Sequence, residues 1–238
     1  MKTIIRKTLN FLHLDITQNL KYDRLTKLVM KRVIDSDSNC VDVGCHKGEI
    51  LQDILKLSPN GKHFAFEPIP EMFENLKDKF GDRATLSSEA VSDRTGSTSF
   101  NWVKNAPAYS GLKERIYAVD TPDIQKVEVE LDTLENVIPA DVKIDFLKID
   151  VEGGEFDVIK GGLQKLKKDQ PVIVFECGLG ASEYYDTDIA TMYKLITDEI
   201  ELKLYTLSSF INNTGALSLE EFKGFYDSNS EYYFVASK

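Results

Sequence analysis

The sequence contains few cysteines, and their arrangement suits neither a disulfide framework nor a thiolate zinc site. Three cysteines occur among the 238 residues, at Cys40, Cys45 and Cys177, and none belongs to a Cys-x-x-Cys pair. Disulfide-rich domains carry paired cysteines, and cysteine-rich zinc sites need closely spaced thiolates. The cysteine content fits a reducing compartment, so we expect a cytoplasmic protein.

Basic residues are outnumbered by acidic ones. The chain holds 29 Lys and Arg against 39 Asp and Glu, which gives a formal net charge of −10 at pH 7. Binding to nucleic acid or to an anionic membrane surface depends mainly on Lys and Arg that face phosphate groups. We therefore expect no nucleic-acid partner, although a local basic patch is compatible with this charge balance.

Long apolar runs are also lacking. No stretch approaches the ~20 apolar residues of a membrane span. Lys2, Arg6 and Lys7 interrupt the apolar residues near the N-terminus, so the core of a signal peptide is missing as well. We expect no membrane span. A chain of 238 residues, of which 42% are hydrophobic, has the size and composition of one large α/β domain.

Apolar strands alternate with helical periodicity along the chain. Residues 4–34 have apolar side chains at helical spacing, and short strands separated by amphipathic helices follow from residue 40. The expected buried strands cover residues 40–43, 63–66, 85–91, 146–150 and 171–176, with further strands at 97–103, 126–131, 202–207 and 232–235. This pattern predicts a doubly wound, mainly parallel sheet with antiparallel pairing at its end. We expect residues 1–36 to form an N-terminal helical segment packed on the core of a domain that covers residues 37–238.

Residues 103–125 form the longest stretch without clear periodicity. Loops of this length are uncommon in compact domains and are often lids or binding loops. Trp102, Tyr109 and Tyr117 lie on or beside this stretch. Their rings would either stack on a sugar or simply cover the site.

An acidic residue stands at the end of each strand that we expect to be parallel. These residues are Asp42, Glu67, Glu89, Asp150 and Glu176. In open α/β sheets, ligands bind beyond the carboxyl ends of the strands, where the strand order reverses. The functional site is therefore expected among these acids.

The first strand ends in the loop Asp42-Val43-Gly44-Cys45-His46-Lys47-Gly48. Gly44 permits a tight turn, and Gly48 lets a ligand approach the start of the next helix. A dinucleotide-binding GxGxxG loop has a second glycine where this chain has His46. The Asp42 carboxylate suits a cationic ligand group better than a diphosphate, unless Asp42 and the glycines only shape a turn.

Glu67 ends the second strand. An acid about 20 residues beyond a glycine loop is placed to accept hydrogen bonds from the two hydroxyls of a ribose. NAD enzymes and adenosyl-cofactor enzymes share this feature, so it does not separate them. The alternative is a solvated surface glutamate, which a position between two buried strand–helix units disfavours.

Two motifs resemble a known family. The Asp42–Gly48 loop, followed by Phe66-Glu67-Pro68, resembles the cofactor site of class I S-adenosylmethionine-dependent methyltransferases. The run from Asp145 to Glu155, which contains Lys-Ile-Asp-Val-Glu-Gly-Gly-Glu, resembles the signature of the FkbM-type branch. The resemblance covers about residues 38–238.

The resemblance implies a Rossmann-like sheet of seven strands that uses S-adenosylmethionine to methylate a hydroxyl of a sugar, a glycan or another small molecule. By position, Asp42 and Gly44 would lie near the methionine part of the cofactor and Glu67 would hold its ribose. The strand end that contains Glu89 and Ala90 would lie by the adenine. His46, Gly48 and Pro68 complete the expected cofactor-binding set.

Asp150 and Glu152 are the expected catalytic residues. We expect Asp150 to face the cofactor or the acceptor and to bond the cofactor's amino group. Methyl transfer to a hydroxyl requires removal of its proton, for which Glu152 or His46 is the candidate base. Glu152 could instead be an acid favoured only by the positive end of the following helix.

Other interpretations remain open at this point. Oxygen ligands from Asp150 and Glu176 would suit Mg²⁺, but the resemblance implies no metal and we do not expect one. An NAD-type oxidoreductase and a catalytically inactive Rossmann-like binding module are the competing functions. The pattern assigns neither a particular acceptor nor an oligomeric state.

Overall fold

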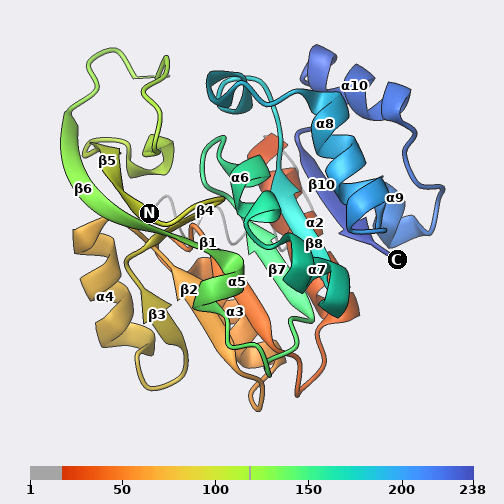
Figure 1. Cartoon of the computed structure of the whole chain (residues 1–238), viewed down its shortest axis with the longest axis horizontal. Coiled ribbons are helices and arrows are strands. Elements are labelled where there is room, and N and C mark those ends of the chain that lie inside the picture. The colour runs from red at the N-terminus through yellow and green to blue at the C-terminus, as the bar shows by residue number, and fades with distance from the viewer. Residues whose placement is uncertain (1–17, 118) are drawn as a thin grey trace.

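The computed structural model describes residues 18–117 and 119–238, and its centre is a seven-stranded sheet (Figure 1). The strand order is β3-β2-β1-β7-β8-β10-β9. These strands are β1 (Cys40–Val43), β2 (His63–Phe66), β3 (Thr85–Ser87), β7 (Phe146–Ile149), β8 (Val172–Glu176), β9 (Lys203–Thr206) and β10 (Tyr233–Ser237). Neighbouring strands are parallel from β3 to β8, whereas β10 is antiparallel to both β8 and β9. The expected doubly wound sheet with an antiparallel end is confirmed.

The strand order reverses between β1 and β7. The chain runs outward from β1 through β2 to β3, and later returns to β7, which pairs with the other side of β1. The carboxyl ends of β1 and β7 therefore flank the place where open α/β sheets bind ligands. Asp42 lies within β1 near this end, and Asp150 follows directly after β7.

Helices cover both faces of the sheet (Figure 1). In the described ranges they are α2 (Gln18–Val33), α3 (Glu49–Leu57), α4 (Pro70–Phe80), α5 (Leu134–Val137), α6 (Glu155–Lys160), α7 (Leu163–Asp169), α8 (Ile189–Lys194), α9 (Leu207–Asn212) and α10 (Leu219–Ser228). The chain also forms the 3-10 helices η1 (Pro107–Tyr109) and η2 (Ser182–Tyr185) and the π-helix η3 (Leu195–Glu199). Side chains of α2, α3 and α9 form one apolar core with the sheet, and those of α5 to α8 and α10 form the core on the other face.

The two-residue period of the strands decides which side chains share a face. Cys40 of β1 and Phe146 of β7 belong to the core under α2 and α3. Successive strand residues point to opposite faces, so residues two apart share one. Asp42 and Lys148 therefore lie on this same face, and the register pairs them across β1 and β7. A carboxylate and an ammonium are thus placed side by side inside the sheet.

The single strand expected over residues 85–91 was wrong. The chain forms β3 and then a separate strand β4 (Ala90–Ser92), which pairs with β6 (Ile124–Thr133) in a small sheet of order β4-β6-β5. β5 (Gly96–Val103) runs antiparallel to β6. Between β3 and β4, the Ser87 hydroxyl accepts a hydrogen bond from the Glu89 N–H and donates one to the Glu89 carboxylate. These local bonds turn the chain out of the main sheet.

The described part of the N-terminal segment packs on the core. Leu25, Val29 and Met30 of α2 are buried with Cys40 and Phe146 of the sheet. Residues 4–17, the first part of the predicted helical stretch, fall outside the described residues. Within residues 18–117 and 119–238, no helix combines the length and the apolarity that crossing a membrane would require.

Two helices near the C-terminus, α9 and α10, were not predicted. α10 begins with a capping box, in which the Ser218 hydroxyl accepts from the Glu221 N–H and the Glu221 carboxylate accepts from the Ser218 N–H. This Ser-x-x-Glu spacing is a helix-start signal that is visible in the sequence. Phe222 and Tyr226 of α10 cover the antiparallel end of the sheet.

Candidate active site

A cavity of about 450 Å³ opens at the carboxyl ends of β1, β2 and β7. Most of the site residues expected from the sequence line it. They are Asp42, Gly44, His46, Glu67, Pro68, Glu89, Ala90, Asp150 and Glu152. Gly48 does not line the cavity, because it packs on α4: a Cβ at this position would lie 2.6 Å from the Phe80 ring and 2.7 Å from Leu76. The predicted roles of all these residues stay predictions.

The loop after β1 is held against the end of β7. Gly44 has a φ of 78°, and a Cβ at this position would lie 1.8 Å from the Asp150 carbonyl oxygen. The next turn contains His46 at a φ of 50°, a left-handed conformation that few side chains adopt readily. The close contact brings the ends of β1 and β7 together at one wall of the cavity.

Glu67 fixes the same loop from the other side. Its carboxylate accepts hydrogen bonds from the backbone N–H groups of His46, at 2.7 Å, and Ile69, at 2.9 Å. The residue is 4% exposed, so the solvated alternative is wrong. Burial raises the pKa of Glu67 to about 7. Each carboxylate oxygen has a second lone pair, so Glu67 can hold the loop and still accept a ligand hydroxyl.

Asp42 is a fully buried acid at 0% exposure, and neither of its oxygens has a well-formed hydrogen bond in the described chain, although the Leu51 N–H lies near enough to favour the charged form. Burial raises its pKa to about 6, although nearby Lys148 favours the charged form. A buried carboxylate without a well-formed hydrogen bond carries a desolvation cost that a cationic ligand group can offset. The residues at this wall therefore fit a cofactor with an ammonium and a sulfonium, as S-adenosylmethionine has.

Lys148 is a buried cation of the site. It is 6% exposed, and its Nζ lies 2.7 Å from Asp150 Oδ2. The Tyr233 hydroxyl donates to the same oxygen at 2.8 Å. Burial acts to raise the pKa of Asp150, but Lys148 outweighs it and the pKa is lowered. Asp150 therefore stays ionised at neutral pH.

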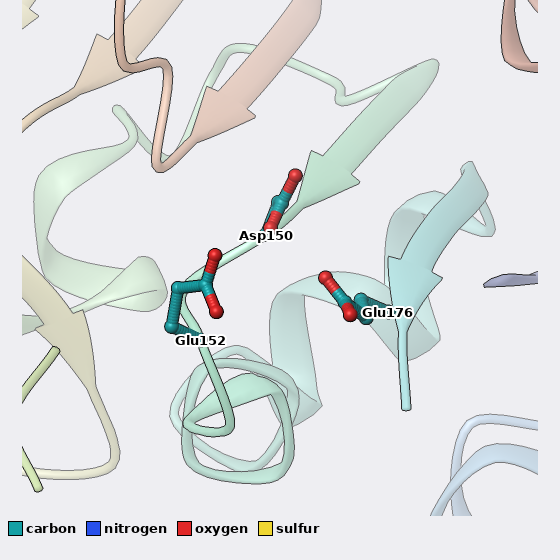
Figure 2. Close-up of side chains that lie close together, drawn as sticks. All are labelled: Asp150, Glu152 and Glu176. Atoms are coloured by element: carbon teal, nitrogen blue, oxygen red, sulfur yellow. The ribbon is translucent and has the colours of Figure 1, made fainter. Parts of the chain in front are cut away.

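Three carboxylates meet beyond β7 and β8 (Figure 2). Asp150, Glu152 and Glu176 each place one oxygen within 4.8 Å of the others. Glu152 has a φ of 59° and Gly153 a φ of 109°, so the chain turns sharply after β7 and brings Glu152 toward Asp150. Burial, and then the charge of Asp150, raise the pKa of Glu152 to about 8 and that of Glu176 well above its usual range.

This cluster has the donor type that a divalent cation prefers, because Mg²⁺ binds carboxylate oxygens. Two side-chain cations already lie within it. Lys148 bonds Asp150, and the Arg115 guanidinium bonds Glu152. These charges offset much of the repulsion among the three acids, so the cluster by itself does not require a metal.

The segment between β5 and β6 folds over the cavity, which Pro107, Ala108, Ser110 and Leu112 help to line. The Tyr185 hydroxyl accepts hydrogen bonds from the N–H groups of Leu112, at 3.1 Å, and Lys113, at 3.3 Å. Arg115 donates to the Gly180 carbonyl oxygen at 2.8 Å as well as to Glu152. The long aperiodic stretch is therefore tied to the loop after β8.

Lys148, Tyr233 and Arg115 were not among the site residues predicted from the sequence. Lys148 was detectable, since it is a lysine two positions before Asp150 in an otherwise apolar strand, and a two-residue period puts both on one face. Tyr233 reaches Asp150 only because β10 pairs with β8 opposite Glu176. Arg115 lies in the aperiodic stretch, where no local pattern marks it.

The fold and the cavity define a Rossmann-like methyltransferase architecture. The FkbM methyltransferase from Methylobacillus flagellatus KT superposes with a TM-score of 0.51 at 12% identity, over 91% of this chain and 52% of the solved one. At this identity the likeness concerns the fold alone. Residues 42–200 match the model of the methyltransferase FkbM domain. The protein belongs to the FkbM methyltransferase family.

Two curated relatives are named as methyltransferases. The 2-O-methyltransferase NoeI of Sinorhizobium fredii (strain NBRC 101917 / NGR234) is 26% identical over 167 residues, which are 64% of this chain and 67% of NoeI. The methyltransferase sdnD of Sordaria araneosa is 28% identical over 159 residues, 54% of this chain and 61% of sdnD. The chain thus spans about two thirds of these relatives.

Proposed function

We propose that this protein transfers the methyl group of S-adenosylmethionine to a hydroxyl oxygen of a sugar, glycan or other small molecule. Family membership supports methyl transfer, and the name of NoeI supports oxygen as the accepting atom. The observation that carries the proposal is the fully buried Asp42, which lacks a well-formed hydrogen bond and lines the 450 Å³ cavity beside ionised Asp150. The buried, free cysteines are compatible with a cytoplasmic location.

The cofactor, when bound, supplies an electrophilic methyl group on a sulfonium. Asp42 and Asp150 provide negative charge for its cationic end, and Gly44 allows the backbone to approach it. Glu67 would accept the ribose hydroxyls, with Pro68 beside it. Glu89, between β3 and β4, and Ala90, the first residue of β4, would line the adenine end, while His46 would close the loop over the methionine part. Gly48 would act through the shape of that loop.

Glu152 is the proposed base. It lines the cavity, and its pKa of about 8 lies near neutral pH, where a carboxylate accepts a proton most effectively. Arg115 bonds this carboxylate and also the loop after β8, so it is a positioning residue. Asp150, kept charged by Lys148, does not compete for the acceptor proton. His46 is the alternative base, because burial and then Lys47 lower its pKa and keep the imidazole neutral.

The rate should therefore rise with pH as the base loses its proton. With Glu152 as the base, kcat follows a single ionisation whose midpoint lies near 8, or lower when a cationic cofactor stabilises the carboxylate. A Glu152→Gln variant should lose this pH dependence together with most of its rate. A His46→Gln variant serves as the comparison. If the His46 variant loses the pH dependence while the Glu152 variant keeps it, His46 is the base.

Glu67→Ala should weaken the affinity for S-adenosylmethionine by about 1–3 kcal/mol, the usual cost of leaving buried partners unpaired. The variant removes the carboxylate proposed to accept hydrogen bonds from the ribose hydroxyls. It also leaves the backbone N–H groups of His46 and Ile69 without their hydrogen-bond partner. Calorimetry with the methyl donor measures the loss. Glu89→Ala, at the proposed adenine end, is the matched control with a smaller expected effect. An unchanged affinity in Glu67→Ala would remove Glu67 from the ribose site.

Chelation should leave the rate unchanged. Asp150 and Glu152 are already bonded to Lys148 and Arg115, so we expect no catalytic metal at the carboxylate cluster. Turnover is compared before and after dialysis against EDTA, and again after addition of Mg²⁺. Loss of activity that Mg²⁺ restores would assign the cluster of Asp150, Glu152 and Glu176 to a metal.

Transfer itself is tested with methyl-labelled S-adenosylmethionine and a panel of hydroxylated sugars and small molecules. Label in an ether product supports the proposed function. Cofactor binding without transfer to any acceptor would favour the inactive binding module. Oxidation of an acceptor with NAD⁺ would instead restore the oxidoreductase interpretation.

A further inference from the structure

A second cavity, of about 400 Å³, lies beside the first and has no place in the cofactor site just described. It is bounded by α4, by β5 and by the loop after β1. His46, Lys47 and Pro107 line both cavities, so the two adjoin. A ligand that reaches through this shared wall could extend from the first cavity into the second.

The wall of the second cavity is rich in cations. Lys47, Lys79 and Lys104 line it, against one acid, Glu71. All three lysines are exposed at the surface. None of them forms an ion pair with a described residue, whereas Lys21, Lys27, Lys56 and several other lysines do. In a chain with a net charge of −10, this is a local concentration of unneutralised positive charge.

An aromatic face lies among these lysines. Trp102 of β5 lines the cavity and is half-buried, and Lys104 Nζ lies 5.2 Å from the centre of its ring. Its indole Nε1 is buried and has no hydrogen-bond partner in the described ranges. A ring face suits the apolar C–H side of a sugar, and an unpaired N–H requires an acceptor oxygen.

We propose that the second cavity binds the non-reacting end of an anionic saccharide acceptor, one that carries a phosphate or a carboxylate group. The sugar ring lies against Trp102, and the anionic group is held by Lys79 and Lys104, with Lys47 at the entrance to the cofactor cavity. This assignment rests on the proposed function, because it names the acceptor class of the same reaction. A cavity of this volume is of the size that small-molecule sites have.

Tryptophan fluorescence can report binding at this cavity, because Trp102 is the only tryptophan of the chain. Its fluorescence is followed during titration with glucose, glucose 6-phosphate, glucuronate and inorganic phosphate, with the protein alone and with S-adenosylhomocysteine. We expect the two anionic sugars to bind at least about 10-fold more tightly than glucose, since ionic hydrogen bonds are stronger than neutral ones. The two sugars distinguish a phosphate from a carboxylate as the preferred group.

Charge-removing variants test the role of the lysines. The double variant Lys79→Gln/Lys104→Gln should lose most of the preference for anionic sugars and keep its affinity for S-adenosylhomocysteine. Lys194→Gln on α8, across the molecule from α4 (Figure 1), is the matched control and should behave as the wild type. High salt should reduce the preference as well.

Three results would overturn the assignment. They are equal affinity for glucose and its anionic derivatives, no fluorescence change with any of these probes, and inorganic phosphate that binds as tightly as glucose 6-phosphate. Binding of S-adenosylhomocysteine is scored separately by calorimetry. If it binds while the sugars fail, the acceptor class is wrong and the methyltransferase function stands. If it does not bind, the proposed function fails whatever the sugars do.

Discussion

Replacement of Lys148 by Met should lower the free energy of unfolding by about 3–5 kcal/mol, the cost of removing one partner from a buried ion pair. Lys148 is 6% exposed and lies between Asp150, which it bonds, and Asp42, which is paired with it in the register of the sheet. Without the ammonium, the buried Asp42 carboxylate would face the partly exposed carboxylates of Asp150 and Glu176 with no cation between them. Urea unfolding of the purified variant measures the change.

A second buried lysine separates the structural role of Lys148 from its functional one. Lys165 bonds Asp169 at 2.8 Å, both side chains are buried, and the pair lies in α7 outside the cavity. Lys165→Met should therefore cost similar stability but bind the methyl donor normally below its unfolding temperature. Lys148→Met should lose both stability and the binding of the methyl donor. If Lys148→Met is as stable as the wild type, the buried charge arrangement has been misassigned.

Partial rescue provides a stricter test of the Lys148–Asp150 pair. In the double variant Lys148→Met/Asp150→Asn, the orphaned carboxylate at position 150 is gone, so the combined loss should be smaller than the sum of the two single losses. Residues in direct contact couple in this way, and additive losses indicate independent sites. Additive losses here would show that Lys148 does not stabilise Asp150.

Asp150→Asn should reduce turnover by about 100-fold or more, while the fold survives. The side chain is anchored by Lys148 and Tyr233, and in the proposed function its ionised carboxylate would face the cationic end of the cofactor. Loss of that charge misplaces the methyl donor relative to the acceptor, and small displacements in a reacting complex cost about 100-fold in rate. Lys148 retains Asp42 as a counter-ion, so a large loss of stability is not expected.

The matched control is Asp145→Asn, at the opposite end of the same strand. Asp145 accepts a hydrogen bond from the Asn39 N–H at 2.9 Å and lies away from the cavity. Initial rates with labelled methyl donor and a saturating acceptor are compared for both variants, with circular dichroism to verify folding. Wild-type turnover in a folded Asp150→Asn variant would end its catalytic role.

Much of the fold was predictable because strand period and strand position follow from local sequence. The apolar strands around Val41, Leu147 and Ile173 are short and buried, and their alternation with helical stretches fixes parallel pairing. The break after Ser87 was not predictable in this way. It depends on the Ser87–Glu89 hydrogen bonds and on pairing of Ala90–Ser92 with β6, about 40 residues later in the chain.

The site was predictable to a similar degree. Asp42, Glu67 and Asp150 could be expected at the cavity because the strand ends of a parallel sheet share one edge. The hydrogen bonds of Glu67 to two backbone N–H groups could not be predicted from the sequence, because they depend on the exact turn of a neighbouring loop. Arg115 reaches Glu152 from a segment without periodicity, so only the folded chain reveals that pair.

We propose that the cavity between β1 and β7 binds a cationic adenosyl cofactor. Calorimetric titration of the purified protein with S-adenosylmethionine, S-adenosylhomocysteine and NAD⁺ tests it most directly. We expect saturable binding of the methyl donor and its demethylated product, and no binding of NAD⁺. Binding of NAD⁺, or of none of the three, would contradict the assignment of Asp42, Glu67 and Asp150 to the cofactor.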